Sequence, residues 1–329
     1  MKKKALISGI GGQDGSYLAE FLIKKNYIVH GIVRKVSLED KNHKLWRLKS
    51  ILKKIKLHSA SLDSFSEIAK LIKKIKPNEF YHLAAYSYVN YSLDNDHSIF
   101  ESNVLGTQTI LSAIKKFSPK TKLYFAGSSE MFGNAKQTPQ NEKSLFNPRS
   151  AYGVSKVKGH KLIKKFREDN NLFCCTGILY NHESPRKNFE FVSRKITYVA
   201  ARIKLGLENK LELGNIFAKR DWGHAKDYVK AMWLMLQNKK PEDFVISTGE
   251  LHSVKEFLTL AFSYLGLDYK KYIVINKTFF RPKEKKQLVG NNTKAKKKLK
   301  WKPEIKFKDL VKEMVNADID LIKKHGKVL

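Results

Sequence analysis

The amino-acid sequence predicts an α/β fold, a Rossmann-type doubly wound parallel sheet with a smaller C-terminal α/β domain. Two observations carry this prediction. Apolar runs rich in Val, Ile, Tyr and Phe alternate with helical segments through the first half, and a glycine-rich turn follows the first run. The second half alternates less regularly. We expect a dinucleotide-binding domain in residues 1–180, with part of 215–248, and a substrate domain in 181–329 that closes over the carboxyl ends of the strands.

Five apolar runs are expected to form buried parallel strands, because each is short and is bounded by glycine, serine or charged residues. A helix is expected from Gly15, and further helices should fill the intervals between the runs. The five runs are KALISG (4–9), YIVHGIV (27–33), EFYHLAA (79–85), KLYFAGSS (122–129) and LFCCTGILY (172–180).

The net charge of +33, from 64 Lys and Arg against 31 Asp and Glu, invites a nucleic-acid interpretation. The lysines, however, are spread over nearly the whole length, and the densest run, 294–302, has the size of an exposed helix end. We therefore expect a solvated basic surface that attracts phosphate-bearing metabolites, and no nucleic-acid partner. A nucleic-acid-binding protein that keeps an inactive Rossmann fold is the competing hypothesis.

The sequence shows no sign of membrane insertion or export. No apolar run approaches the ~20 residues that span a bilayer, and the basic N-terminus precedes too short an apolar run for a signal peptide. Cys174 and Cys175 are adjacent, so on a strand they point to opposite faces, which favours core packing over a disulfide or a metal site. We expect a cytoplasmic protein with no bound metal and no membrane contact.

The glycine-rich turn predicts a dinucleotide site. Gly9, Gly12 and Gly15 lie at three-residue spacing between the first strand and the first helix. Gly9 allows a tight turn, Gly12 lets a pyrophosphate approach the backbone, and Gly15 lets helix and strand pack closely. The second strand ends at Arg34 and Lys35, with no acidic residue there to bind a ribose hydroxyl. Basic residues at that point accommodate a 2′-phosphate, so NADP is favoured over NAD.

A candidate catalytic cluster follows from two further segments. The run at 122–129 brings Ser128 and then Glu130 to the carboxyl end of a strand, where doubly wound folds bind ligands. Tyr152 and Lys156 are four residues apart, on one face of a predicted helix. We expect the positive charges of Lys156 and of a nicotinamide to lower the pKa of Tyr152, so that it accepts a hydroxyl proton. Ser128 would bind the same substrate oxygen, and Lys156 the nicotinamide ribose.

Longer segments of the chain match a known family. The sequence resembles the extended short-chain dehydrogenase/reductases and, within them, the GDP-mannose 4,6-dehydratase family. The resemblance extends from ALISGIGGQDGSYLAEFL to AKKKLKWKP, and its most specific parts are LYNHESPR, LGNIFAKRDWGHAKDYVKAMWLMLQ and PEDFVISTGELHSV. It implies an NADP-dependent dehydration of a GDP-linked hexose by a homo-oligomer, either a dimer or a tetramer.

The resemblance also gives Glu130 a role. In this family the tyrosine acts as base while C4 of the hexose is oxidised, and the carboxylate then removes the C5 proton and helps to expel water from C6. The hydride returns to C6, so the cofactor is regenerated in each turnover. Ser128 stands where the family usually has threonine, which keeps the hydroxyl.

Further contacts are implied residue by residue. Cofactor contacts are implied for Gln13, Asp14, Leu62, Leu83, Ala84, Ala85, Ser87, His182 and Lys187, the last of which replaces an arginine of the family. Contacts to the GDP-sugar are implied for Asn181, Lys195, Arg220, Arg281 and Glu284.

The chain departs from the family near the sugar pocket, where Tyr86 and Tyr88 are new. The same dehydration of GDP-N-acetylglucosamine is therefore an alternative to GDP-mannose. A GDP-sugar reductase or epimerase of the same superfamily is a second alternative, but it offers no use for Glu130.

Overall fold

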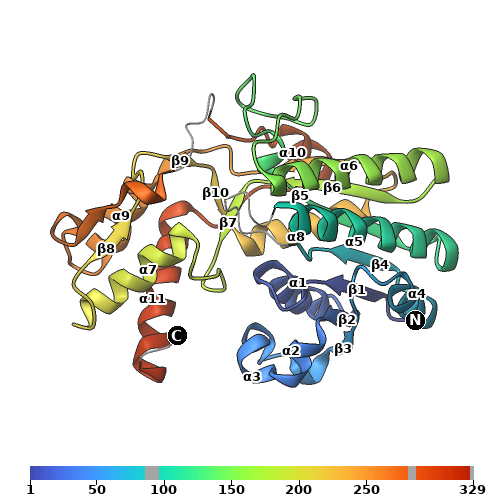
Figure 1. The fold of residues 1–329 in the computed structure, drawn as a ribbon, viewed down its shortest axis with the longest axis horizontal. Coiled ribbons are helices and arrows are strands. Elements are labelled where there is room, and N and C mark those ends of the chain that lie inside the picture. The colour runs from blue at the N-terminus through green and yellow to red at the C-terminus, as the bar shows by residue number, and fades with distance from the viewer. Residues whose placement is uncertain (86–95, 281–286, 327–329) are drawn as a thin grey trace.

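The computed structural model describes residues 1–85, 96–280 and 287–326. A seven-stranded parallel sheet forms the centre, with strand order β11-β6-β5-β4-β1-β2-β3 (Figure 1). This is the doubly wound arrangement that the sequence predicts. The strands are β1 (Lys4–Ser8), β2 (Ile28–Val33), β3 (Lys56–Ser59), β4 (Glu79–His82), β5 (Lys122–Ser128), β6 (Cys174–Leu179) and β11 (Phe244–Ile246).

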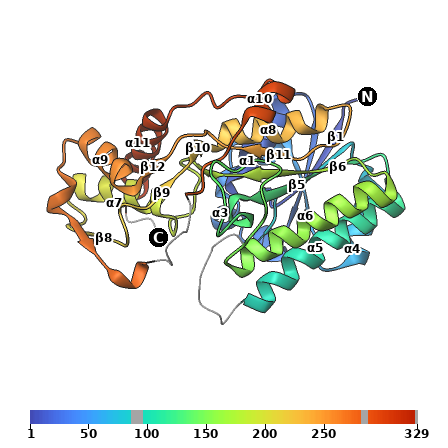
Figure 2. The same ribbon diagram turned by 90° about the horizontal axis from the view of Figure 1, so that it is seen from above.

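Helices cover both faces of the sheet (Figure 2). One core, which includes Ile68, Ile110 and Ile163, lies under α4 (Phe65–Ile75), α5 (Asp96–Phe117) and α6 (Ala151–Asn170). The other core, which includes Leu18 and Met232, lies under α1 (Gln13–Lys24), α8 (Ala225–Gln237) and α10 (Thr293–Leu299). These cores fix the positions of the strand ends that carry the candidate site.

The five predicted strands are confirmed, and two more strands join the sheet. β3 has only four residues, KLHS, three of them polar, and β11 has only three residues, so neither forms an apolar run that sequence reasoning detects. The cysteines lie in β6 and are buried without a disulfide, as expected. Although α8, β11 and α10 come after residue 180, they pack on the large sheet; the boundary at 180 stays a prediction.

A second, smaller body packs around its own core of Phe257, Phe262 and Met314. A buried ion pair joins two of its helices, with Arg194 Nη2 2.6 Å from Asp318 Oδ1. Its elements are α7 (Val192–Lys204), α9 (Val254–Tyr264), α11 (Phe307–His325), the parallel pair β8 (Leu211–Leu213) and β13 (Ile273–Ile275), and the antiparallel pair β9 (Lys219–Arg220) and β12 (His252–Ser253). The parallel strands β7 (Asn181–Glu183) and β10 (Trp222–His224) lie between the two bodies (Figure 1).

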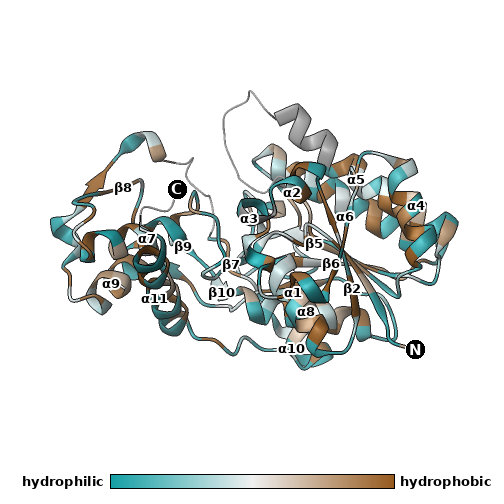
Figure 3. Ribbon diagram, turned by 90° about the horizontal axis from the view of Figure 1, so that it is seen from below, coloured by the Kyte–Doolittle hydropathy of each residue, from teal (hydrophilic) through white to brown (hydrophobic). Residues whose placement is uncertain are grey.

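The flanking helices carry both hydrophobic and hydrophilic residues along their lengths (Figure 3). Two short helices, α2 (Lys35–Glu39) and α3 (Lys41–Lys44), follow β2. Across the described ranges 1–85, 96–280 and 287–326, no helix combines the length and the apolar character needed to cross a bilayer.

Candidate active site

A cleft of about 1540 Å³ opens at the carboxyl ends of the central strands. Ser8, His82 and Ser128, the last residues of β1, β4 and β5, lie on its wall. The cleft continues past β7 and α7 to β8 in the smaller body. It therefore joins the edge of the sheet where doubly wound folds bind ligands to the second body of the molecule.

The glycine turn between β1 and α1 is tightly packed. Gly9 has a φ of +76°, and a Cβ there would lie 2.8 Å from the backbone nitrogen of Ala84. A Cβ on Gly15 would lie 2.3 Å from the carbonyl oxygen of Gly9. Gly12 is the N-cap of α1 and provides no side-chain cap, so the first-turn amides of the helix are left to an outside acceptor.

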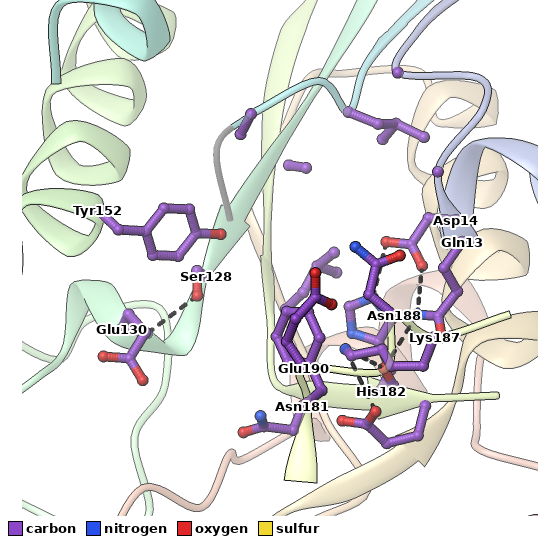
Figure 4. A pocket seen from close by; sticks show the side chains of 18 of the residues that line it. Gln13, Asp14, Ser128, Glu130, Tyr152, Asn181, His182, Lys187, Asn188 and Glu190 are labelled. Carbon is purple, nitrogen blue, oxygen red and sulfur yellow. Dashed lines mark hydrogen bonds and ion pairs between the residues drawn. The ribbon is translucent and has the colours of Figure 1, made fainter. Parts of the chain in front are cut away.

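Asp14 and His182 tie this turn to β7. The Asp14 Oδ2 atom is 2.8 Å from His182 Nε2, and the carbonyl oxygen of Tyr180 is 2.7 Å from His182 Nδ1. Burial opposes ionisation of Asp14, but the charge and hydrogen bond of His182 outweigh it and lower the pKa of the carboxyl. Gln13 and Lys187 both donate to the carbonyl oxygen of His182, at 3.2 and 3.0 Å. The predicted cofactor residues of α1 and those in and after β7 are thus held together (Figure 4).

Tyr152, Ser128 and Glu130 lie together on the opposite side of the cleft (Figure 4). Ser128 ends β5, and its hydroxyl accepts from the amide of Glu130 at 3.2 Å. Ser150 caps α6 by accepting from the amide of Gly153, which places Tyr152 in the first turn. A Cβ on Gly153 would lie 2.7 Å from the carbonyl oxygen of Glu130, so this glycine lets the helix approach the turn that carries the carboxylate.

The ionisation of Tyr152 differs from the expectation. Burial raises its pKa well above the ordinary value, the Glu130 charge adds to that rise, and a hydrogen bond with Ser128 opposes it. Lys156, whose pKa falls to about 8 because it is buried, is not among the groups that shift Tyr152. Its Nζ lies 5.7 Å from the centre of the tyrosine ring. Lys156 alone therefore does not lower the pKa of Tyr152, and further positive charge is needed in the cleft.

Sequence reasoning missed a buried polar network beside this cluster. His82 Nδ1 and Ser8 Oγ are 2.8 Å apart, and His82 Nε2 and Thr107 Oγ1 are 3.1 Å apart. Because Thr107 donates its hydrogen to the carbonyl oxygen of Asn103, His82 Nε2 carries a hydrogen and Nδ1 accepts from Ser8. Burial, together with the charge of Lys156, lowers the pKa of His82 to about 3, so this imidazole is neutral.

The network ends at α6, the helix that carries Tyr152. Asn103 donates to the hydroxyl of Ser155 at 3.1 Å, and Ser155 donates to the carbonyl oxygen of Tyr152 at 2.8 Å. A continuous series of hydrogen bonds thus runs from β1 through β4 and α5 to the first turn of α6. No local motif marks His82 or Asn103, because the partners come from four separate elements.

The other predicted residues divide into three groups. Lys35 is exposed and does not line the cleft, whereas Arg34, Ser37 and Lys44 do, so the basic pair of the sequence contributes one of its two members. Ser87, Arg281 and Glu284 lie outside the described residues. The remaining predicted positions line the cleft: Leu62, Leu83, Ala84, Ala85, Asn181, Lys195 and Arg220.

Several cleft residues were not predicted, among them Glu190, Glu212, Phe217 and Phe279. In the described part of the chain, no three His, Cys, Asp or Glu side chains gather in a way that could hold a metal ion.

The fold, the glycine turn and the Ser–Tyr–Lys cluster together define an extended short-chain dehydrogenase/reductase.

Comparisons with known proteins identify the family within this class. The family model for GDP-mannose 4,6 dehydratase matches residues 6–314. The chain is 48% identical to GDP-mannose 4,6 dehydratase 2 of Arabidopsis thaliana over 100% of its own length and 90% of that protein. It is 44% identical to the human GDP-mannose 4,6 dehydratase over 97% of its length and 92% of that protein. The chain belongs to the GDP-mannose 4,6-dehydratase family.

Solved structures share the fold at low sequence identity. UDP-glucose 4-epimerase of Thermotoga maritima, with UDP-glucose, has a TM-score of 0.85 and 22% identity, covering 97% of this chain and 99% of that one. dTDP-glucose 4,6-dehydratase of Bacillus anthracis, with NAD, has a TM-score of 0.83 and 20% identity, covering 98% and 97%. RMD of Pseudomonas aeruginosa, with NADPH, has a TM-score of 0.81 and 20% identity, covering 97% and 100%.

Proposed function

We propose that the protein is an NADP-dependent GDP-sugar 4,6-dehydratase that converts GDP-mannose to its 4-keto-6-deoxy product. The observation that carries the proposal is the carboxylate of Glu130, which shares a cleft with Tyr152 and stands on the turn that Ser128 caps. A simple reductase or epimerase has no use for a carboxylate at this point. Membership of the family, and the names of its relatives, support GDP-mannose as the substrate.

The cleft fits a nicotinamide dinucleotide. Gly9 and Gly15 leave no room for side chains, and the uncapped start of α1 suits a pyrophosphate. Arg34, at the start of α2, would bind a 2′-phosphate, which favours NADP. Leu62 and the segment 83–85 line the same cleft and would flank the cofactor, with His182 and Lys187 on the side of the smaller body.

In the first half of the reaction the substrate loses the C4 hydroxyl proton. We assign its removal to Tyr152 Oη, with Ser128 Oγ donating a hydrogen bond to the same substrate oxygen. Lys156, one helical turn away, would bind the nicotinamide ribose and add its charge to that of the nicotinamide beside Tyr152. A bound nicotinamide dinucleotide supplies the hydride acceptor, the later hydride donor, and the second positive charge that the raised pKa of Tyr152 requires.

In the second half Glu130 does the work that separates a dehydratase from a dehydrogenase. A ketone at C4 acidifies the C5 proton, and the Glu130 carboxylate takes that proton. The C6–oxygen bond then breaks as a C5–C6 double bond forms, and the same group gives the proton to the departing hydroxyl, which leaves as water. The product would follow from addition of the stored hydride at C6 and of a proton at C5. Asn181, Lys195 and Arg220 would hold the GDP portion, where the two cations pair with the diphosphate.

Incubation with a panel of GDP-sugars tests the proposal. The panel holds GDP-mannose, GDP-N-acetylglucosamine and other GDP-hexoses, and mass spectrometry and NMR follow the loss of one water and the appearance of a 4-ketone. We expect product from GDP-mannose with no net consumption of NADPH. Absence of a keto product from every GDP-sugar would overturn the proposal. Product from GDP-N-acetylglucosamine instead would change the sugar and keep the reaction.

Two further outcomes identify the alternatives. Stoichiometric consumption of NADPH, or inversion of a ring centre without loss of water, would indicate a reductase or an epimerase.

We also propose a homo-oligomer, a dimer or a tetramer, on the basis of the family resemblance; the molar mass from light scattering would distinguish the two states.

A further inference from the structure

The end of the cleft furthest from the glycine turn carries a carboxylate and two aromatic side chains. It is lined by β8 of the smaller body, which lies away from the large sheet (Figures 1 and 2), and by residues 278–280. Glu212, the middle residue of β8, lines this end together with Phe217 and Phe279. A carboxylate is unexpected in a cleft that must also bind an anionic diphosphate.

The position of Lys195 indicates which part of a GDP-sugar would lie at this end of the cleft. Its Nζ lies 4.6 Å from the ring centre of Phe279, and its charge interacts with that of Glu212. The following argument rests on the proposed function, in which Lys195 binds the diphosphate of a GDP-sugar. With the hexose at Tyr152 and the diphosphate at Lys195, the nucleobase must lie on the far side of Lys195, beside Glu212.

The Glu212 carboxylate is held in place. Asn276 Nδ2 donates to Glu212 Oε2 at 3.3 Å, and Lys210 Nζ lies 3.5 Å from Oε1. The hydrogen bond from Asn276 and the charge of Lys210 lower the pKa of Glu212, so the group is an ionised acceptor. An ionised carboxylate offers two oxygens to a ligand that presents two adjacent N–H donors.

We propose that Glu212 selects guanine, by accepting hydrogen bonds from the N1–H and the N2 amino group of the base. Guanine presents these two donors side by side. Hypoxanthine has N1–H but lacks the amino group, and adenine presents an unprotonated N1, whose lone pair a carboxylate repels. Uracil has a single N–H between two carbonyl oxygens. A carboxylate therefore discriminates among the four bases where a neutral backbone contact does so weakly.

The aromatic side chains at this end complete a base-binding site. Phe217 is 69% exposed and Phe279 is 49% exposed, so both rings leave apolar surface open to a ligand. Both rings line the cleft, so they are available to stack on the faces of a planar base while Glu212 contacts its edge. Stacking favours every base alike, which leaves the choice of guanine to Glu212.

Calorimetric binding of nucleoside diphosphates to the full-length protein tests the proposal without requiring turnover. The ligands are GDP, IDP, ADP and UDP, and the variants are Glu212→Ala and Glu212→Gln. Glu208→Gln is the matched control, because Glu208 is a nearby surface carboxylate that pairs with Arg202 outside the cleft.

We expect the wild-type protein to bind GDP about 10-fold or more tightly than IDP, because IDP forfeits one hydrogen bond to a charged acceptor. Glu212→Ala should bring this ratio close to one, Glu212→Gln should reduce it, and Glu208→Gln should preserve it. A GDP-to-IDP ratio that is unchanged in Glu212→Ala would overturn the assignment of Glu212.

The same data separate this proposal from the proposed function. If GDP binds with the expected selectivity but no GDP-sugar is dehydrated, the reaction fails and the guanine site stands. If a GDP-sugar is dehydrated and Glu212→Ala keeps full guanine selectivity, the reaction stands and the role of Glu212 fails. If none of the four nucleotides binds, both proposals fail.

Discussion

At the scale of single residues, we propose that Glu130 decides which reaction the cleft performs. Its backbone is fixed by the capping hydrogen bond to Ser128 and by the close approach of Gly153, and its charge acts on the pKa of Tyr152. We expect Glu130→Gln to lower the rate of dehydration about 100-fold to 10,000-fold, because the amide cannot accept the C5 proton. The measurement is the rate of formation of the 4-keto-6-deoxy product.

A control variant and a second measurement, the amount of reduced cofactor, make this prediction specific to Glu130. Glu168→Gln, which changes an exposed carboxylate on α6, should leave the rate unchanged. Oxidation at C4 does not need Glu130, so the Gln variant should accumulate reduced cofactor, detected by absorbance. Full dehydration by Glu130→Gln would show that another group removes the C5 proton.

His82 provides a second residue-scale prediction, on pH and stability. Its pKa is about 3 in the folded chain against 6.5 for an ordinary histidine, so between these values the unfolded chain binds a proton that the folded chain does not. The contribution to stability is complete above pH 6.5 and is lost as the pH falls toward 3. The slope it adds reaches about 1.4 kcal/mol per pH unit.

Urea unfolding at several pH values between about 4 and 7 measures this slope. His82→Asn, which keeps a donor and an acceptor for Ser8 and Thr107, should give a flatter dependence on pH than the wild-type protein. His325→Asn, at the exposed end of α11, is the control and should keep the wild-type slope. Identical slopes for the wild-type and His82→Asn proteins would mean that His82 is not the buried neutral group described here.

At the scale of elements, we propose that the segment after β2 controls the choice between NADP and NAD. Arg34, Ser37 and Lys44 come from the start of α2, from within α2 and from the end of α3, and all three line the cleft. We expect Arg34→Ala and Lys44→Ala each to raise the Kd for NADP⁺ about 10-fold, because each removes a cation from the 2′-phosphate. Affinity for NAD⁺, which lacks this phosphate, should change little.

Lys35 is the matched control for this pair, since it is adjacent to Arg34 in the sequence but does not line the cleft. Fluorescence titration with NADP⁺ and NAD⁺ measures all three variants. Lys35→Ala should bind both cofactors like the wild-type protein. Equal losses of affinity for NADP⁺ and NAD⁺ in Arg34→Ala would show that Arg34 contacts a part that the two cofactors share.

The elements also show which features the sequence can reveal. The Gly9–Gly15 turn, the pair Ser128 and Glu130, and the pair Tyr152 and Lys156 are local patterns, each within one strand end or one helical turn, so spacing predicts them. His82 and Glu212 belong to no such pattern. They enter the site because β4 and β8 are brought to it by the fold. The high pKa of Tyr152 was unforeseen for a related reason, since it depends on burial, which spacing does not encode.

At the scale of the whole molecule, the net charge of +33 has two opposite effects. Mutual repulsion of like charges destabilises the compact chain, while the same positive field attracts a GDP-sugar, which carries negative charge on its diphosphate. Both effects act over distances that salt screens. Raising the salt concentration from about 0.01 M to about 0.15 M shortens the Debye length from roughly 30 Å to roughly 8 Å.

We therefore expect stability and substrate capture to respond in opposite directions to added NaCl. The Tm should rise by about 2 °C or more, because repulsion in the folded chain weakens, while kcat/KM for the GDP-sugar should fall about 10-fold as the attraction of the anion is lost. Sucrose at equal osmolarity is the control and should not lower kcat/KM. A Tm that falls with salt would mean that attractive pairs such as Arg167 and Asp243, not the excess of lysine, dominate the electrostatic free energy of the fold.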